Sequence, residues 1–192
     1  MRELSLQIGT GDAWAECIVD NFDEFILDHA ANERKASTMA MTLVAHYPDR
    51  KPLMEAMIEL ALEELNHFRQ VVKIIHQRGL MITSDEKDPY VNQLRGFVRG
   101  GSDDYFLDRL LSAAVIEARG AERFSILAET LADPKLKAFY TTLAQSENKH
   151  HCLFLDIAHS YFPEQTVDQR LLEWLQIEKN VIEQLPIHPR LH

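Results

Sequence analysis

Apolar residues recur every three or four positions along most of the chain, which is the pattern of amphipathic helices. One such stretch runs from Asn21 to about Tyr47 and ends at Pro48. Asn21 followed three residues later by Glu24 is a capping-box pattern, which favours a helix start there. The pattern therefore predicts a long helix over residues 21–47.

Turn residues divide the rest of the chain into further helices. Proline in a first turn, Asp-Pro pairs and glycine just beyond a helix end are typical boundary signals. They predict long helices over residues 50–78, 102–131, 134–161 and 166–185, a short one over 12–20, and another beginning at Asp88-Pro89 within the connector 79–101.

The lengths of the joints predict how these helices are connected. The joints near Pro48 and Ala132 are too short for anything but antiparallel neighbours, whereas about twenty residues separate the two pairs. Two antiparallel hairpins joined by a long crossover are typical of a ferritin-like four-helix bundle. We therefore predict an all-α, ferritin-like single domain over residues 1–192, with extra N- and C-terminal helices.

Composition narrows the class of protein. The net charge is −10, from 20 Lys and Arg against 30 Asp and Glu, which argues against bulk electrostatic binding to nucleic acid or anionic membrane. A local basic face remains compatible with it. Charges interrupt every long segment, residues 1–11 lack a signal-peptide pattern, and two cysteines cannot build a disulfide framework. We expect a cytoplasmic protein with no membrane span.

Two helices carry the same short motif, Leu-Ala-x-x-Glu-x-x-His. It places Glu64 with His67 in one helix and Glu147 with His150 in another. Residues three apart share a helix face, so a carboxylate and an imidazole converge on one point and form half of a transition-metal site. The motif alone is weak, since Asp156 and His159 show a similar spacing.

The preceding helix of each hairpin strengthens this interpretation. Glu33 precedes Glu64 by 31 residues, and Glu117 precedes Glu147 by 30. Both lie between small residues one turn away, as an inward-facing carboxylate in a packed hairpin requires. The halves thus repeat with one Glu plus one Glu-x-x-His each, which indicates a duplicated metal half-site. Four carboxylates and two imidazoles suit a pair of iron or manganese ions.

Neighbouring residues are weaker candidates. Glu122 is the main rival to Glu117 but breaks the spacing match, and Glu63 lies off the ligand face. His29, one turn before Glu33, is a candidate for supporting a ligand. His151 points about 100° away from His150, and Cys152 is expected to be a buried core thiol.

Longer blocks of sequence point to one family. Three blocks of the sequence resemble the tRNA 2-methylthio-N(6)-isopentenyladenosine hydroxylase family. They are Asp28-His-Ala-Ala-Asn-Glu-Arg-Lys-Ala36, Glu63-Glu-Leu-Asn-His-Phe68 and Glu117-Ala-Arg-Gly-Ala-Glu-Arg-Phe124. The resemblance extends from about Asn21 to Leu185. The Glu-x-x-His pairs are shared by ferritin-like dimetal proteins in general, whereas the first and third blocks are more specific.

The resemblance implies a non-haem diiron monooxygenase with two iron ions. Its substrate would be the isopentenyl group of the modified adenosine at tRNA position 37, its oxidant dioxygen, and its reductant an unidentified electron-donor protein. The family pattern places the ligands on Glu33, Glu64, His67, Glu117, Glu147 and His150, the six residues that the spacing also selects, with no further catalytic residue. Iron over manganese follows from the family alone.

A tRNA substrate requires a local basic patch on this acidic chain. The candidates are Arg95, Arg99, Arg34, Lys35, Arg119, Arg123 and Lys149, with the run from Arg95 to Gly101 the most favoured because an aromatic residue and glycines accompany its charges. The alternative for this run is a solvated connector in which Phe97 is buried.

Other functions remain open from the sequence. One is a ferroxidase or iron-storage protein, and another is a peroxide-handling rubrerythrin or manganese-catalase relative, although the Cys-x-x-Cys pair of most rubrerythrins is absent. A helical scaffold with unused Glu and His residues is the non-enzymatic alternative. The sequence does not identify the electron donor or the oligomeric state.

Overall fold

A computed structural model describes residues 4–192, and helices are the regular secondary structure of this part of the chain. The all-α prediction is therefore confirmed. The helices are α1 (Asp12–Asp20), α2 (Phe22–His46), α3 (Lys51–Gln77), α4 (Pro89–Arg95), α5 (Ser102–Thr130), α6 (Pro134–Tyr161) and α7 (Glu164–Gln184).

The chain divides into two compact units, and the division falls within α1. The α2–α3 unit comprises Glu16–Glu86 and residues 188–191, and the α5–α6 unit comprises the described residues up to Ala15, Lys87–Ile187 and His192. The single domain expected over residues 1–192 stays a prediction, and its residues 1–3 lie outside the described part.

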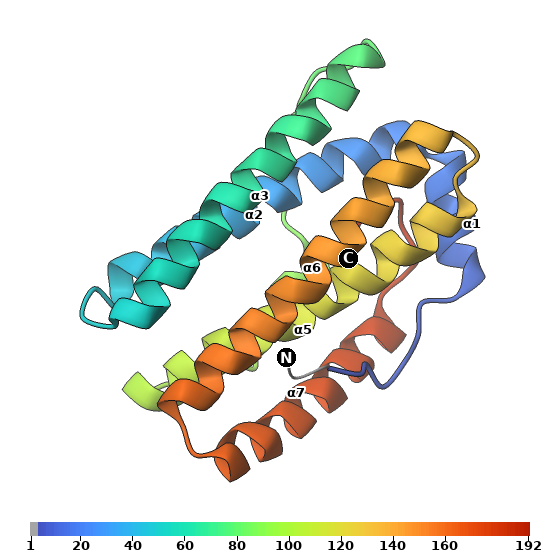
Figure 1. Cartoon of the computed structure of the whole chain (residues 1–192). Coiled ribbons are helices and arrows are strands. Elements are labelled where there is room, and N and C mark those ends of the chain that lie inside the picture. The colour runs from blue at the N-terminus through green and yellow to red at the C-terminus, as the bar shows by residue number, and fades with distance from the viewer. Residues whose placement is uncertain (1–3) are drawn as a thin grey trace. The chain divides into compact units, whose positions relative to one another are not determined.

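In the first unit, α2 and α3 form an antiparallel hairpin (Figure 1, blue and teal). Ser37 Oγ donates a hydrogen bond across it to the Ala61 carbonyl at 2.8 Å, which fixes the register of the two helices. Pro52 lies in the first turn of α3, and Gly79, with a φ of 75°, follows its end. That positive φ explains the glycine, because L side chains rarely adopt it.

In the second unit, α5 and α6 form the other antiparallel hairpin (Figure 1, yellow and orange). Asp133 caps α6 by accepting hydrogen bonds from the backbone N–H groups of Lys135 and Leu136, at 2.7 and 3.1 Å. Asp88 caps α4 in the same way. Helices α4 and α7 pack against α5 and against each other. These two hairpins and their long connector confirm the ferritin-like prediction.

At two helix starts the capping residues predicted from the sequence, Asn21 for α2 and Ser102 with Asp103 for α5, do not act as caps. Asn21 makes no side-chain cap, because its Nδ2 donates to the Cys17 carbonyl at the end of α1 instead. Helix α5 begins after Gly101, which has a φ of 92°, and Ser102 lies inside the helix rather than capping it. The predicted boundaries of the other helices agree with the structure to within about two residues, the usual scatter of helix ends. Helix α4 is the exception, because it was predicted to reach the Gly100-Gly101 pair and ends at Arg95.

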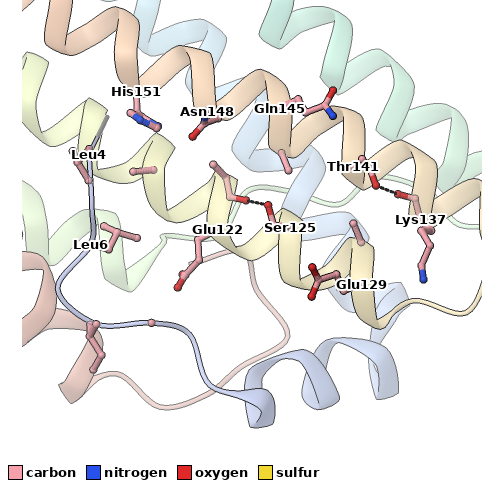
Figure 2. Close-up of a pocket in the computed structure, with 16 residues that line it drawn as sticks. Leu4, Leu6, Glu122, Ser125, Glu129, Lys137, Thr141, Gln145, Asn148 and His151 are labelled. Carbon is pink, nitrogen blue, oxygen red and sulfur yellow. Dashed lines mark hydrogen bonds between the residues drawn. The ribbon is translucent and has the colours of Figure 1, made fainter. Parts of the chain in front are cut away.

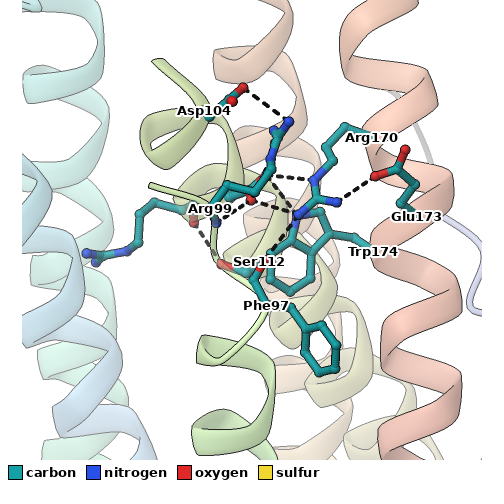
Figure 3. A network of polar contacts seen from close by, with 9 residues as sticks. Phe97, Arg99, Asp104, Ser112, Arg170, Glu173 and Trp174 are labelled. Carbon is teal, nitrogen blue, oxygen red and sulfur yellow. Dashed lines mark hydrogen bonds and ion pairs between the residues drawn. The ribbon is translucent and has the colours of Figure 1, made fainter. Parts of the chain in front are cut away.

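A buried carboxylate, Asp108, joins the connector before α5 to α7. Its partners Arg99, Arg170 and Trp174 lie close together in Figure 3. It accepts three hydrogen bonds from Arg99, two from Arg170 and one from Trp174, at 2.8 to 3.3 Å. Burial alone would raise the pKa of Asp108, but the Arg170 and Arg99 donors outweigh it and hold the pKa at about 2. Arg170 also donates to the Phe97 carbonyl, which fixes the loop.

No helix among residues 4–192 combines the length and the apolar character needed to cross a membrane.

Candidate metal centre

The α2–α3 hairpin brings together Glu33, Glu64 and His67, all of which are buried. His67 Nδ1 lies 3.4 Å from Glu64 Oε2 and 3.6 Å from Glu33 Oε2. One possible ligand atom from each of the three lies within 4.8 Å of the others. Glu64 and His67 meet because they are three residues apart on α3, and Glu33 reaches them from α2 because the hairpin is antiparallel.

His29 supports this cluster from one turn earlier on α2. Its Nε2 lies 2.6 Å from Glu33 Oε1, so the imidazole N–H donates to the carboxylate, and its side chain is fully buried. A donor on the back of a carboxylate fixes the orientation in which the other oxygen is presented. The structure therefore places His29 where the sequence suggested, beside Glu33.

The α5–α6 hairpin holds a second cluster of the same composition. Glu117 on α5 and Glu147 and His150 on α6 are buried, and one ligand atom of each lies within 4.8 Å of the others. His150 Nδ1 lies 2.9 Å from Glu147 Oε2. In both hairpins the Nδ1 atom of the histidine faces an oxygen of the glutamate three residues before it.

Gly120 lies on α5 one turn after Glu117 and faces Glu147 on α6. A Cβ atom at this position would meet Glu147 Cγ at 4.0 Å, which is an ordinary van der Waals contact. The small residue thus leaves room for the side chain of Glu147, and one methyl group at this position would still make an ordinary contact with it.

The two clusters match the donor preferences of a transition metal. Each offers two carboxylates and one imidazole, and buried carboxylates are costly unless a cation or strong donors offset their charge. Oxygen-rich sites with a few imidazoles suit iron or manganese, whereas structural zinc sites favour thiolates. Each hairpin thus carries a buried Glu and His group that could hold a metal ion.

The rival candidates lie elsewhere in the structure. Glu122 accepts hydrogen bonds from Thr10 N and Oγ1 at 2.8 and 2.7 Å, so it anchors the N-terminal segment and is absent from the cluster of Glu117. His159, which lies three residues after Asp156, is 3.4 Å from Asp168 and belongs to neither of the clusters that could hold a metal ion. Glu63 is exposed, and Cys152 is buried as expected.

His151 lines a separate cavity of about 770 Å³ in the α5–α6 unit (Figure 2). The cavity lies between the N-terminal segment, represented by Leu4 and Leu6, and the two helices of the hairpin. None of the residues that line it belongs to the Glu and His clusters. The sequence favours a surface or supporting role for His151 over metal ligation; the structure buries it and leaves it outside the clusters that could hold a metal ion.

Two of the predicted tRNA contacts are buried. Arg119 is fully buried, and its guanidinium pairs with Glu178 at 2.7 Å and donates to the Ile8 carbonyl at 2.9 Å. Arg123 is also buried and packs over the ring of Trp14, with the guanidinium carbon 4.9 Å from the ring centroid. Neither side chain is placed to contact a phosphate, and we drop both from the set of candidate contacts.

Charges near these arginines shift several pKa values. Burial lowers the pKa of Arg123 to about 10, and the neighbouring Arg119 adds to the effect. Burial acts to lower the pKa of Arg119 as well, but Glu178, Glu122 and Tyr90 together outweigh it, so the pKa of that arginine is raised. Burial raises the pKa of Glu178 despite the attraction of Arg119. This network is structural in character: it ties α7 and the N-terminal segment to α5.

The other candidate contacts remain at the surface to different degrees. Arg34 pairs with Asp85, and Lys35 Nζ donates to the Glu86 carbonyl at 2.9 Å, so both hold the connector against α2. Arg99 is partly exposed but bonded to Asp108, whereas Arg95 and Lys149 are exposed.

Phe97, between Arg95 and Arg99, has 49% of its surface exposed. The alternative interpretation of this connector, in which Phe97 is buried, is therefore wrong.

Asp108, Arg170 and Glu178 were not singled out from the sequence. They contact residues between 9 and 88 positions away, and no spacing within a single helix reveals such pairs.

The chain as a whole is similar to proteins of one family. The family model described as tRNA-(ms2io6A)-hydroxylase (MiaE) matches residues 2–192. The chain is 36% identical over 152 residues to the tRNA 2-(methylsulfanyl)-N(6)-isopentenyladenosine(37) hydroxylase of Pseudomonas putida, covering 79% of this chain and 74% of that protein.

A protein of the same name from Salmonella typhimurium is 30% identical over 155 residues, which is 81% of this chain but only 56% of that protein. Among solved structures, Protein 43 with aldehyde deformylating oxygenase activity from Synechococcus matches with a TM-score of 0.93 and 33% identity. The match covers 100% of this chain and 96% of that one.

Proposed function

Since the chain belongs to the tRNA-(ms2io6A)-hydroxylase (MiaE) family, we propose that it hydroxylates the isopentenyl group of 2-methylthio-N(6)-isopentenyladenosine at tRNA position 37. The observation that carries the proposal is the pair of buried clusters, each with one lone glutamate and one Glu-x-x-His pair. The names of the two curated relatives supply the substrate, and the activity in the name of the structural neighbour is also that of an oxygenase.

The proposed cofactor is a pair of iron ions. Glu33, Glu64 and His67 from one hairpin and Glu117, Glu147 and His150 from the other would supply the ligands. Two divalent ions would offset the four carboxylate charges, which supports ions rather than protons as the partners of these groups. When bound, such a pair activates dioxygen with electrons from outside the protein.

The residues of the chain have three tasks in this reaction. The six ligands present oxygen and nitrogen atoms in fixed positions, and His29 holds Glu33 in one orientation through its hydrogen bond. Buried apolar residues one helical turn before a ligand, such as Leu60 before Glu64 and Leu143 before Glu147, would exclude water from a strongly oxidising site.

The reaction balances with one external reductant. One oxygen atom of dioxygen enters a C–H bond of the isopentenyl group, and the other leaves as water with two protons and two electrons. An electron-donor protein would supply those electrons, and a tRNA substrate would place the reaction in the cytoplasm.

The tRNA would contact the exposed connector before α5. Arg95 is exposed, Arg99 is held by Asp108, and the half-exposed ring of Phe97 lies between them. Cationic side chains next to an exposed aromatic ring suit an unpaired nucleotide and its phosphates. Replacing Arg95 with Glu should weaken tRNA binding and reduce its salt dependence. Unchanged binding would remove this connector from the proposal.

Nucleoside mass spectrometry tests the function. Reduced, iron-loaded protein is mixed with dioxygen and tRNA that carries the methylthio-isopentenyl adenosine, and the digested tRNA is analysed for a gain of one oxygen atom on that nucleoside. Glu64→Ala should lose both this product and bound iron, because Glu64 is buried in the cluster. Glu63→Ala is the matched control, since the neighbouring glutamate is exposed.

Each result of this experiment is informative. Product in the wild type and in Glu63→Ala, but not in Glu64→Ala, supports both the substrate and the ligand assignment. If protein that holds two irons per chain gives no product, the hydroxylase proposal fails while the metal proposal survives. Rapid dioxygen release from peroxide, or iron oxidation without substrate turnover, would then identify the alternative chemistry. Equal iron content in the two variants would refute the ligand assignment.

A further inference from the structure

Helix α3 carries a second apolar stripe on its solvent side. Ile58, Leu62 and Leu65 have 37%, 58% and 49% of their surface exposed. They are spaced by four and three residues, so they lie next to one another along one face of the helix. The solvent side of an amphipathic helix is normally polar, and contiguous exposed apolar side chains mark interaction surfaces.

This stripe lies away from the side of α3 that carries Glu64 and His67. Each of its members follows a buried residue by five positions, as Leu62 follows the fully buried Met57. Five residues correspond to about 140° around an α-helix. The stripe is therefore separate from the candidate metal ligands and is not explained by packing within the α2–α3 hairpin.

The charges that flank the stripe are arranged symmetrically about Leu62. Glu55 lies seven residues before it and Arg69 seven residues after it, and both are exposed. Seven residues are close to two helical turns, so both charges lie on the face of the stripe. Glu55 is 3.7 Å from Lys51, but exposed ion pairs of this kind are weak and exchange readily.

Such a pattern is complementary to itself. In an antiparallel pairing across a two-fold axis at Leu62, this leucine meets its own copy and Glu55 of each chain faces Arg69 of the other. A parallel pairing would instead place like charges together. Lys51 and Lys73 lie eleven residues before and after Leu62, so in the antiparallel register Lys51 of each chain faces Lys73 of the other. Because like charges repel, this favours two helices that cross at an angle and separate toward their ends.

We propose that this face of α3 is a self-association surface that pairs with the same face of a second copy of the chain. The self-complementary charges favour a second copy over an unrelated protein. A single pair of crossed helices buries less than the roughly 800 Å² per partner of a standard interface. The dimer is therefore reversible, with a dissociation constant on the order of micromolar.

Sedimentation velocity of the full chain tests the proposal over a range of about 1 to 200 μM, which spans the expected dissociation constant. Leu62→Glu should raise the dissociation constant more than about tenfold, because it places two carboxylates at the centre of the interface. The control is Leu172→Glu on α7, the same substitution at another exposed leucine, with 64% of its surface exposed. Circular dichroism checks that both variants remain helical.

Charge reversal tests the register. Glu55→Arg and Arg69→Glu should each weaken the dimer about fivefold, and the double variant should restore it, because the two charges only exchange places. A wild-type chain that stays monomeric over the whole range overturns the proposal and leaves the stripe to a different partner. So does a Leu62→Glu variant that dimerises as the wild type does. A double variant as weak as the single ones overturns the antiparallel register.

Discussion

Replacing Asp108 with Asn should destabilise the protein strongly, because this carboxylate is the buried acceptor for two arginines and a tryptophan. Asparagine keeps the shape of the side chain but removes the charge. It also turns an N–H₂ group toward donors in place of one acceptor oxygen. The effect on the free energy of unfolding should therefore exceed the loss of one neutral hydrogen bond.

The pKa of Asp108 gives the magnitude. In the folded protein it is lowered from 3.8 to about 2, and donors from Arg170 and Arg99 overcome the opposing effect of burial. One pKa unit corresponds to about 1.4 kcal/mol, so the ionised carboxylate contributes about 2 kcal/mol at neutral pH. The Asn variant should lose at least about that much.

The pH dependence has a definite sign. Because the folded pKa is depressed, the stabilisation is fully present above the unfolded value of 3.8 and is lost as the pH falls toward 2. The difference in unfolding free energy between wild type and Asp108→Asn should therefore shrink with acid. Between about pH 6 and about pH 3 the expected reduction is about 1 kcal/mol.

Urea unfolding followed by circular dichroism at several pH values measures this difference. Asp104→Asn serves as the control, since Asp104 lies on the same helix and pairs with the same Arg99 at 3.1 Å, but is exposed. It should cost less than about 0.5 kcal/mol, as exposed ion pairs do. A wild-type advantage over Asp108→Asn that stays constant from pH 6 to about pH 3 would refute the reasoning.

Two further substitutions probe the candidate metal centre. Gly120→Ala should be tolerated, and should gain up to about 1 kcal/mol of helix stability, because its Cβ would lie 4.0 Å from Glu147 Cγ. Gly120→Leu should displace that carboxylate and lower iron content, measured by elemental analysis; equal iron in the two variants would contradict this account. His29→Gln should reduce iron affinity about tenfold to a hundredfold, because it alters the 2.6 Å contact with Glu33. A titration that gives the wild-type affinity would show that the contact plays no part in binding.

The sequence predicts the helices of this protein well because their signals are local. Asp133 caps α6 and Gly79 follows α3, as expected from residues adjacent to each boundary. The Asn21 cap fails because α1 ends immediately before α2, and the Asn21 side chain is used by the Cys17 carbonyl. A capping residue between two consecutive helices can serve either of them, and its own sequence pattern does not say which.

The candidate metal ligands were accessible to the same kind of reasoning. Glu64 with His67 and Glu147 with His150 are separated by three residues, so helix geometry alone brings each pair together. Predicting the lone glutamate of each cluster requires one further step. The register of the antiparallel hairpin determines which residue of the preceding helix lies opposite the Glu-x-x-His pair. In the structure, Glu117 meets its cluster, whereas Glu122 bonds to Thr10.

The basic residues were not accessible in this way, because a charge on a helix does not reveal its partner. Arg119 donates hydrogen bonds to Glu178, 59 positions later in the sequence, and to the Ile8 carbonyl of the N-terminal segment, 111 positions earlier. Both partners reach α5 only after α7 and that segment have packed against it. Periodicity identifies which side of a helix is apolar, but a helix covered on several sides buries its polar residues too. The candidate tRNA contacts are therefore limited to basic side chains that remain exposed, and Arg95 is the clearest of them. Replacing Arg95 with Glu separates a tRNA-binding role from a structural one.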